Sequence, residues 1–251
     1  MTVTSLAIGV FGGLGRMGSA VVARAPAHGI EVSEIIDRRL QADGVCPKLK
    51  ENPDWCAEAY LDFTTPEAFG QILSGCVEHR APLVCGTTGL SAAQFETLAM
   101  SAEKIAVVYD TNMSLGVTVL RELVRKASLL RGMGFDCELV EAHHRHKKDA
   151  PSGTAKSLLQ DIGEATVEHG RNGPHLRSSD EVGVHAIRMG GVLGEHSVYF
   201  ASENEIIELR HSLISRNALA DGALLAAKFV VQATPGLYSM ADVWSWRNTN
   251  P

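Results

Sequence analysis

The 251-residue sequence predicts an α/β protein: a parallel sheet with helices on both faces, joined to a smaller α+β region. Two observations carry this prediction. In the first half, short apolar runs typical of buried strands alternate with stretches of helical periodicity, the pattern of parallel βαβ units. After Asn112 several strand-like stretches follow one another through short turns, which indicates an antiparallel or mixed sheet.

The first half contains three predicted helices between five predicted strands. One helix runs from Arg16 to Ala25 and is closed by Pro26, and a second opens at Thr65-Pro66 with threonine as N-cap. The third follows Ser91 and Gln94, which have capping-box spacing, and reaches about Lys104. The strands are Leu6 to Phe11, Glu31 to Ile36, Tyr60 to Phe63, Leu83 to Cys85 and Ile105 to Tyr109.

The second half begins with a helix that Ser114 can cap and ends with a helix that resembles the first half. Because of that last helix, we predict that residues 1–113 and 217–251 form one domain, into which residues 114–216 are inserted as a second. The elements between the two helices are a strand from Asp136 to Ala142, a helix from about Gly153, and strands at Val184 to Met189, Ser197 to Ala201 and Glu205 to Leu213, followed by the last helix from about Ala218 to Gln232.

Net charge, apolar runs and cysteine spacing exclude several classes of protein. A net charge of −6 argues against a nucleic-acid binder or a protein of anionic membranes, whose domains are usually basic. No apolar run approaches the roughly 18 residues of a spanning helix, and the N-terminus lacks the basic region of a signal peptide. The cysteines form no CxxC pair, so we expect reduced thiols in a cytoplasmic protein; they are Cys46, Cys56, Cys76, Cys85 and Cys137.

A glycine-rich turn follows the first predicted strand and opens the first predicted helix. It reads as GxxGxxG, and in this context glycines let a pyrophosphate approach the helix N-terminus. Asp37, after the second strand, stands where an acidic residue accepts hydrogen bonds from a ribose. Arg38 could pair with a 2′-phosphate, whereas Arg39 reads better as a solvated turn. The turn is Gly12-Gly13-Leu14-Gly15-Arg16-Met17-Gly18.

Two further loops follow strands of the same predicted sheet. Gly86-Thr87-Thr88 comes after Leu83 to Cys85, and Asp110-Thr111-Asn112-Met113 comes after Ile105 to Tyr109. Ligands of open α/β sheets bind outside the carboxyl ends of the strands. Such loops suit the ribose and nicotinamide end of a cofactor, although Gly and Thr are also common turn residues.

Six consecutive residues that can carry positive charge, from His143 to Lys148, lie between a strand and a helix. Crowded cations repel one another unless an anion compensates them, and Ser152-Gly153-Thr154 adds a second anion-binding device at a helix N-terminus. The residues alone favour a site for a small dianionic molecule over a solvated basic loop. A metal site at His144 and His146 lacks a third ligand, and nucleic-acid binding would need basic residues spread over a face.

Several stretches resemble the bacterial 4-hydroxy-tetrahydrodipicolinate reductases, also called dihydrodipicolinate reductases. They are GGLGRMG, DFTTPEA, CGTTGLS, TNMSLGV and, most specifically, EAHHRHKKDAPSGTA, in the order expected over nearly the whole chain. The resemblance implies a homotetrameric NAD(P)H reductase of the diaminopimelate route to lysine. Its Rossmann-like N-terminal domain would bind NADH or NADPH, and its C-terminal domain would bind a dicarboxylate substrate and form the tetramer.

The resemblance also implies roles for individual residues. His143 matches the acid/base histidine and Lys147 the proton-donating lysine, while His144, Gly153 and Thr154 match positions that hold the substrate's carboxylates. The family often has an aromatic residue where Met113 stands, and the segment between Asp37 and Tyr60 is shorter than in many members. The implied cofactor contacts are Gly12, Gly13, Leu14, Gly15, Arg16, Met17, Asp37, Arg38, Gly86, Thr87, Thr88, Asp110, Thr111, Asn112 and Met113.

Two alternatives share the predicted fold. One is another NAD(P)-dependent dehydrogenase of a small acid, for which a semialdehyde-type enzyme would need a nucleophilic cysteine such as Cys85. The other is a nucleotide sensor without catalysis, which the intact set of His143, Lys147 and Gly153-Thr154 argues against.

Overall fold

The computed structural model describes residues 5–38 and 49–249, so Arg39 and Cys46 lie outside the described residues. The chain divides into two compact units. One consists of the residues up to Leu115 together with those from Arg216 onward, and the other of Gly116–Ser215. Within the described ranges, no helix is long and apolar enough to cross a membrane.

The first unit is built on a seven-stranded sheet in which every neighbouring pair of strands is parallel. The order of the strands turns at β1, with β2 on one side and β4 on the other. Ligands of open parallel sheets bind at such a reversal, outside the carboxyl ends of the strands. Across the sheet the strands are β12 (Gly236–Tyr238), β6 (Ala106–Tyr109), β5 (Leu83–Cys85), β4 (Ala59–Asp62), β1 (Leu6–Phe11), β2 (Ile30–Ile36) and β3 (Leu49–Lys50).

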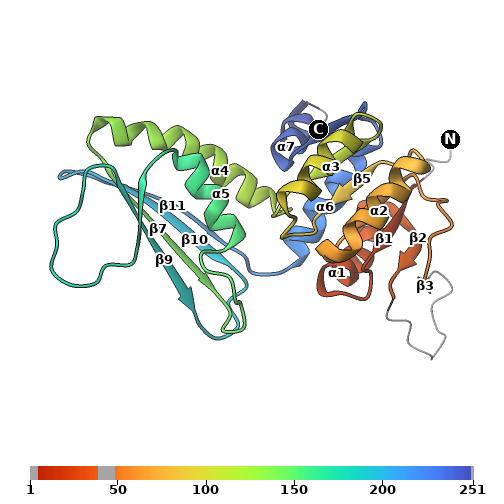
Figure 1. Cartoon of the computed structure of the whole chain (residues 1–251), viewed down its shortest axis with the longest axis horizontal. Helices are drawn as coiled ribbons and strands as arrows, with labels where there is room; N and C mark the ends of the chain where they lie inside the picture. Colours follow the sequence, from red (N-terminus) through yellow and green to blue (C-terminus); the bar gives the residue numbers. More distant parts are fainter. Residues whose placement is uncertain (1–4, 39–48, 250–251) are drawn as a thin grey trace. The chain divides into compact units, whose positions relative to one another are not determined.

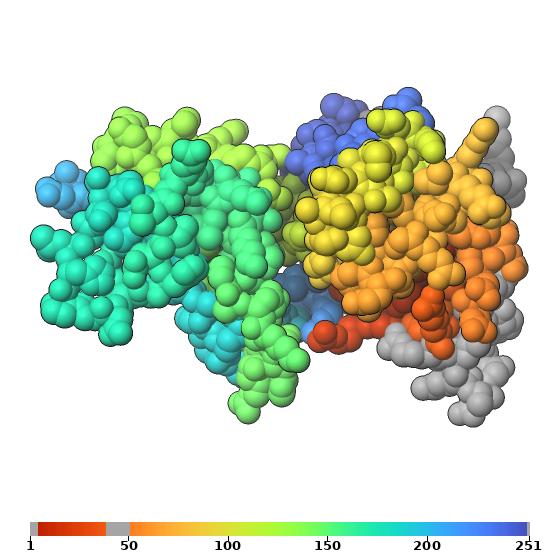
Figure 2. Space-filling view, in the orientation of Figure 1, coloured from red at the N-terminus to blue at the C-terminus, as the bar shows by residue number. Residues whose placement is uncertain are grey.

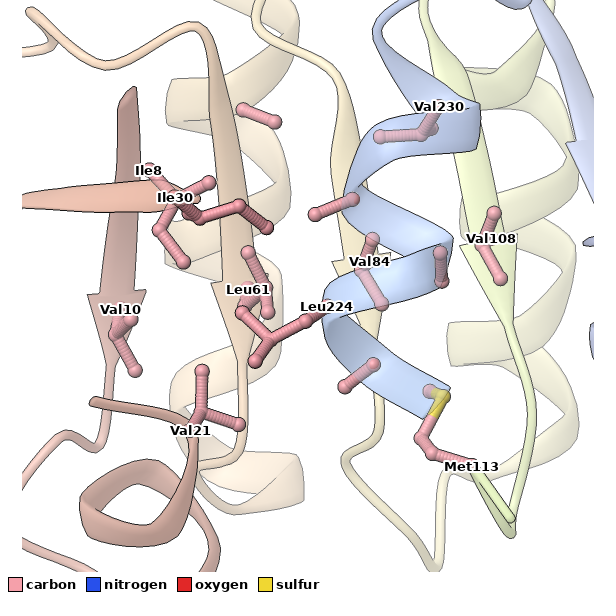
Figure 3. Packing of buried hydrophobic residues seen from close by; sticks show 14 of the residues in the cluster. Ile8, Val10, Val21, Ile30, Leu61, Val84, Val108, Met113, Leu224 and Val230 are labelled. Carbon is pink, nitrogen blue, oxygen red and sulfur yellow. The ribbon is translucent and has the colours of Figure 1, made fainter. Parts of the chain in front are cut away.

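Helices cover both faces of this sheet, each over its own apolar core. Figure 3 shows Leu224 of α6 directed toward Leu61 of β4 and Val21 of α1 in the first core. The second core contains Phe69 of α2 and Leu98 of α3. The helices over the first core are α1 (Arg16–Arg24), α6 (Asn217–Val230) and α7 (Met240–Thr249), and those over the second are α2 (Pro66–Glu78) and α3 (Ala92–Ala102).

The last helix of the sequence prediction, α6, packs against α1 and the parallel sheet. The Arg24 guanidinium on α1 and the His28 ring both lie 2.8 Å from the Asp221 carboxylate on α6. These contacts join segments nearly 200 residues apart in the sequence. α7 packs against α6 and β12 pairs with β6, so both belong to the same unit.

The predicted helices and strands of the first half are present, with differences at their ends. The Ser91–Gln94 capping box is confirmed, but α3 ends at Ala102 rather than near Lys104. The first helix ends at Arg24, and Pro26 lies in a 3₁₀ turn, η1 (Ala25–His28), because its ring is tolerated in a first turn. Thr65 occupies the N-cap of α2 without a capping hydrogen bond from its side chain, which is hydrogen-bonded to Glu67 instead. The prediction missed β3, β12 and α7, which are too short or too weakly patterned to read.

The second unit is a five-stranded mixed sheet covered on one face by two helices, α4 (Leu115–Ala127) and α5 (Gly153–Ile162) (Figure 1). β10 is antiparallel to both of its neighbours, whereas β9 is parallel to β7 and β8. A 3₁₀ turn, η2 (Ser128–Met133), follows α4. Across the sheet the strands are β11 (Ile206–Ser212), β10 (Glu195–Ala201), β7 (Asp136–His143), β9 (Glu181–Arg188) and β8 (Thr166–His169).

Strand alternation decides which side chains of this sheet meet the helices. Cys137 and Leu139 of β7 lie in the core under α4 and α5, so Glu141 and His143 follow on the same face. The prediction ended this strand at Ala142. The structure extends it to His143, which pairs with Arg188 of β9. The mixed sheet is confirmed, and β8 was missed because its residues are mostly exposed.

Candidate functional site

Two glycines of the turn after β1, Gly12 and Gly18, stand where a side chain would not fit. Gly12 has φ +74°, and a Cβ there would lie 2.7 Å from the Phe63 carbonyl oxygen. A Cβ on Gly18 would lie 2.2 Å from the carbonyl oxygen of Gly12, so glycine lets α1 start directly against the turn. This is the close packing that a phosphate-binding turn at a helix N-terminus requires.

A pocket of about 610 Å³ opens beside this turn. Five of the predicted cofactor residues line it: Gly12, Gly15, Arg16, Asp37 and Arg38. Gly13, Leu14 and Met17 belong to the same turn and helix start but do not line the pocket. The sequence did not reveal the other walls. They are Glu51, Asn52, Pro53 and Trp55 with Phe11 and Ile36, and Phe63, Thr64, Thr65, Ala68, Gln71 and Ile72 around the start of α2.

Asp37 and Arg38 follow β2 at the edge of this pocket. Asp37 is buried, and its carboxylate accepts a hydrogen bond from the Leu14 N–H at 3.0 Å, which ties the end of β2 to the glycine turn. Arg38 is exposed and donates to the Gln71 side chain at 2.7 Å. An acidic group and a guanidinium at one pocket edge fit the ribose end of a dinucleotide.

A buried carboxylate on β2, Glu34, holds the wall formed by Glu51–Trp55. It is 0% exposed and accepts hydrogen bonds from Asp54 N at 2.7 Å, Cys56 N at 2.9 Å and the Tyr60 hydroxyl at 2.7 Å. Burial raises the pKa of the Glu34 carboxyl, but the hydrogen bonds from Tyr60 and Cys56 outweigh burial and lower it below its usual value. A glutamate on the otherwise apolar buried face of this strand could have signalled this network.

The Gly86–Thr88 loop is anchored by a second buried acid, Asp62 at the end of β4. The Thr87 hydroxyl donates to Asp62 at 2.9 Å, and Thr64 donates through its N–H at 2.9 Å and its hydroxyl at 2.6 Å. Burial raises the pKa of the Asp62 carboxyl. Thr87 therefore uses its hydroxyl internally, while Gly86 is half-buried and Thr88 exposed at the carboxyl edge of the sheet.

The loop after β6 is also held by its own side chains. The Asp110 carboxylate accepts from Asn112 N at 3.1 Å and from Met240 N at 3.4 Å. Met113 is 3% exposed and packs in the first core, so its side chain offers a ligand little surface. Thr111 is exposed, and this loop lies at the same edge of the sheet as Gly86–Thr88, because β5 and β6 are parallel neighbours.

In the second unit, Glu141 and His143 form the centre of a buried polar cluster. The His143 Nδ1 lies 2.5 Å from one Glu141 oxygen, and Arg188 of β9 contacts both Glu141 oxygens at 2.8 and 2.9 Å. Burial raises the pKa of the Glu141 carboxyl, but the hydrogen bonds from His143 and Arg188 outweigh burial and lower it to about 2. Sequence reasoning found His143 and missed both partners.

The N-terminus of α5 adjoins this cluster. Ser152 caps the helix by accepting from Ala155 N at 3.2 Å, and its own N–H donates to Glu141 at 3.1 Å. Its hydroxyl lies 3.3 Å from Nε2 of His196, a histidine that is 3% exposed. Burial lowers the pKa of His196, and the neighbouring His143 lowers it further, to about 3.

Gly153 and Thr154 form the first turn of α5, as predicted. A Cβ on Gly153 would meet nothing within 4 Å, so open space lies beside this end of the helix. An α-helix supplies no acceptor to the N–H groups of its first turn, and its dipole favours an anion there. The arrangement suits a carboxylate.

The six cationic residues after β7 are not equivalent. His143 is buried and His144 and Lys147 are half-buried, whereas Arg145, His146 and Lys148 are exposed and fit the solvated-loop alternative. The sequence analysis expected an external anion to compensate this cluster. The protein supplies part of the compensation, because Lys147 Nζ lies 3.0 Å from Asp149 and His143 contacts Glu141.

The cationic loop lies beside the loop after β9. Arg145 N donates to Gly190 O at 3.2 Å, and Met189 N donates to His143 O at 2.9 Å. Figure 2 shows the two segments, green and cyan, exposed next to each other at one end of the unit. In the ranges that the structure covers, no three His, Cys, Asp or Glu side chains are placed to hold a metal ion.

Cys85, the nucleophile of a semialdehyde-type alternative, is 0% exposed. Burial raises the pKa of its thiol well above the usual value, and the nearby Asp62 raises it further. A thiol that stays protonated inside the sheet is a poor nucleophile, so the site does not favour that alternative.

Comparisons with known proteins give matches for both the N-terminal and the C-terminal part of the chain. Residues 6–113 match the family model described as "Dihydrodipicolinate reductase, N-terminus", and residues 116–244 match "Dihydrodipicolinate reductase, C-terminus". The 4-hydroxy-tetrahydrodipicolinate reductase of Sulfurimonas denitrificans is 38% identical over 250 residues, which are 94% of this chain and 97% of the relative. That of Halorhodospira halophila is 39% identical over 266 residues, covering 95% and 98%.

Solved structures show the same fold at lower sequence identity. The dipicolinate-bound dihydrodipicolinate reductase from Paenisporosarcina sp. TG-14 has a TM-score of 0.75 at 23% identity, covering 94% of this chain and 98% of that one. The C. glutamicum DAP dehydrogenase in complex with DAP has a TM-score of 0.57 at 12% identity, covering 95% and 94%. From the two family models and the full-length relatives, this chain belongs to the dihydrodipicolinate reductase family.

Proposed function

We propose that this chain catalyses the NAD(P)H-dependent reduction of 4-hydroxy-tetrahydrodipicolinate to tetrahydrodipicolinate in the diaminopimelate route to lysine. The observation that carries the proposal is the buried pair of Glu141 and His143 next to the N-terminus of α5. This arrangement combines a proton-transferring histidine with a carboxylate-binding helix end, and the substrate of the family needs both.

The first unit is proposed to bind the dinucleotide. The glycine turn and the N-terminus of α1 would hold the pyrophosphate, and Asp37 would accept the ribose hydroxyls, since all of them border one pocket. Arg38 would face a 2′-phosphate when NADPH binds, after exchanging its contact with Gln71. When bound, the nicotinamide supplies a hydride to the substrate. The loops Gly86–Thr88 and Asp110–Met113 would border its nicotinamide end, Met113 through its backbone.

The second unit is proposed to bind the substrate and to complete the reduction. Gly153 and Thr154 would take one carboxylate at the helix N-terminus, and His144 would contribute positive charge to the other. Hydride addition to C4 of the cyclic imine leaves an electron-rich, enamine-like species that must be protonated. Lys147 would donate that proton, and His143 would act as acid and base beside it.

The second unit is also proposed to join four copies of the chain in a cytoplasmic homotetramer. The sheet face opposite α4 and α5 has exposed apolar side chains, including Ile187 and Ile206. A second copy of the same face would cover them, as closed symmetric oligomers do. Light scattering in solution that gives the mass of one chain would contradict this part.

The direct test is NAD(P)H oxidation that depends on freshly prepared 4-hydroxy-tetrahydrodipicolinate. We expect turnover with both nucleotides, because Asp37 suits NADH and Arg38 suits NADPH, with catalytic efficiencies within roughly a hundredfold, about 2.7 kcal/mol. Aspartate semialdehyde with NADP⁺ and inorganic phosphate is the control reaction, and it is read as NADPH formation. A chain that binds NADH but supports neither reaction would instead be a nucleotide sensor.

A further inference from the structure

The Glu141 carboxylate, on the face of β7 that α5 covers, is shared between two functional elements. One oxygen contacts His143 Nδ1 at 2.5 Å and Arg188 Nη1 at 2.9 Å. The other accepts from Ser152 N at 3.1 Å and from Arg188 Nη2 at 2.8 Å. One carboxylate therefore connects the acid/base histidine, the cap of α5 and the neighbouring strand.

This contact determines which nitrogen of His143 is available for proton transfer. An ionised carboxylate only accepts hydrogen bonds, so Nδ1 carries a hydrogen toward Glu141 and Nε2 is the nitrogen that can exchange a proton. A Cβ on Gly194 would lie 3.1 Å from Nε2, so the missing side chain leaves room there. Nδ1 is thus held by Glu141, and Nε2 faces the space beside Gly194.

Arg188 extends the same network to the cationic loop. Besides Glu141, its Nη2 donates to the Asp149 carbonyl oxygen at 2.6 Å. Asp149 in turn pairs with Lys147 at 3.0 Å. The groups facing His143 are then Glu141 on its own strand, Arg188 on β9, and His196 on β10, whose ring centre lies 5.3 Å away.

We infer that Glu141 is a positioning residue that sets the tautomer of His143 and, through Ser152, the N-terminus of α5 at which the substrate's carboxylate binds. The inference rests on the proposed function for its kinetic consequences. A carboxylate with a merely structural role would, when lost, lower the folded fraction of the protein. One that positions both elements would change kcat, KM and the pH profile together in the folded protein.

The test compares Glu141→Gln and Glu141→Asp with Asp161→Asn. Asp161 is the matched control, since it is a buried carboxylate of α5 bonded to Arg121 and Arg125 but not to His143. Glu141→Gln should lower kcat about 10–100-fold, raise KM and shift the pH profile, because the ring loses its fixed tautomer. Glu141→Asp keeps a negative charge opposite Arg188, so the protein should fold. This variant should recover part of the lost kcat. Asp161→Asn should keep the wild-type pH profile and KM.

A second readout does not depend on turnover. In ¹⁵N-histidine NMR spectra, the wild-type His143 ring should show a strongly hydrogen-bonded Nδ1–H, and this signal should be absent in Glu141→Gln but present in Asp161→Asn. An unchanged His143 signal in Glu141→Gln overturns the inference, as does a folded Glu141→Asp with wild-type kcat, KM and pH profile. If the wild-type chain has no reductase activity, the proposed function fails, and the NMR comparison alone decides the inference.

Discussion

The two units each bury one glutamate completely, and the two carboxylates have different surroundings. Within residues 5–38 and 49–249, the donors to Glu34 of β2 are neutral: two backbone N–H groups, a thiol and the Tyr60 hydroxyl. Glu141 of β7 accepts from Arg188 and His143, which can both be charged. Burial raises the pKa of each carboxyl, and in each the hydrogen bonds outweigh burial and lower it.

This difference separates a carboxylate that supports a pocket wall from one that contacts an ionisable side chain. Glu34 accepts hydrogen bonds from Asp54 N and Cys56 N, which flank Trp55 in the wall of the pocket, so its carboxylate holds a surface in place. The partners of Glu141 include a side chain that can transfer a proton, so its carboxylate controls a charge. Burial and a lowered pKa alone therefore do not distinguish the two carboxylates, and the chemistry of their partners does.

The largest expected effect is a fall in kcat when a residue of the second unit is replaced, without a change in NADH binding by the first unit. Lys147→Ala removes the proposed proton donor, so kcat should fall by at least about 10²-fold. NADH affinity, measured by fluorescence titration, should stay unchanged because the proposed pocket lies in the first unit. Lys148→Ala, which removes an exposed cation from the same loop, is the control and should be close to wild type. A Lys147→Ala protein that turns over normally would refute the mechanism.

The next effect concerns the wall of the pocket. Glu34→Gln places an amide N–H₂ among the donors of Asp54, Cys56 and Tyr60, and an unpaired buried group costs about 1–3 kcal/mol. The free energy of unfolding in urea should fall by that amount, and the Kd of NADH should rise while kcat changes little.

Tyr60→Phe is the comparison variant. It removes one hydrogen bond to Glu34, at about 0.5–1.5 kcal/mol, together with the 3.3 Å bond from Ala57 N to the Tyr60 hydroxyl. If Glu34→Gln lowered kcat at saturating NADH instead of weakening NADH binding, the two carboxylates would not differ as described.

The smallest effect is a pH dependence of stability in the second unit. The pKa of His196 is lowered to about 3 in the folded protein, so its stabilising contribution is present above about pH 6.5 and is lost as pH falls toward 3. Between pH 6.5 and 5, where few carboxyls titrate, His196 should contribute a slope of up to about 1.4 kcal/mol per pH unit, in addition to that of His211, whose pKa burial also lowers. Urea unfolding of His196→Gln should show a shallower slope, and parallel curves would contradict the assignment.

Much of the fold was readable because it depends on local patterns. The buried strands at Leu6–Phe11 and Leu83–Cys85 and the Ser91–Gln94 capping box are written in consecutive residues. The strands β3, β8 and β12 were not readable, since they have two to four residues and pair only because a neighbouring strand is present. In strands this short, tertiary contacts have a stronger effect than the β-propensity of the residues.

The sequence by itself determined the class of site: a glycine turn after β1, an acidic residue after β2, and His143, Lys147 and Gly153-Thr154 between a strand and a helix. Tertiary structure alone decided which partners those groups have. Arg188 reaches Glu141 across 47 residues, and His196 reaches Ser152 across 44. Strand pairing brings such residues together, and no local pattern encodes it. Hydrogen bonds to these distant partners set the charge and orientation of a buried side chain, so the chemistry of the site depends on contacts that the linear sequence does not display.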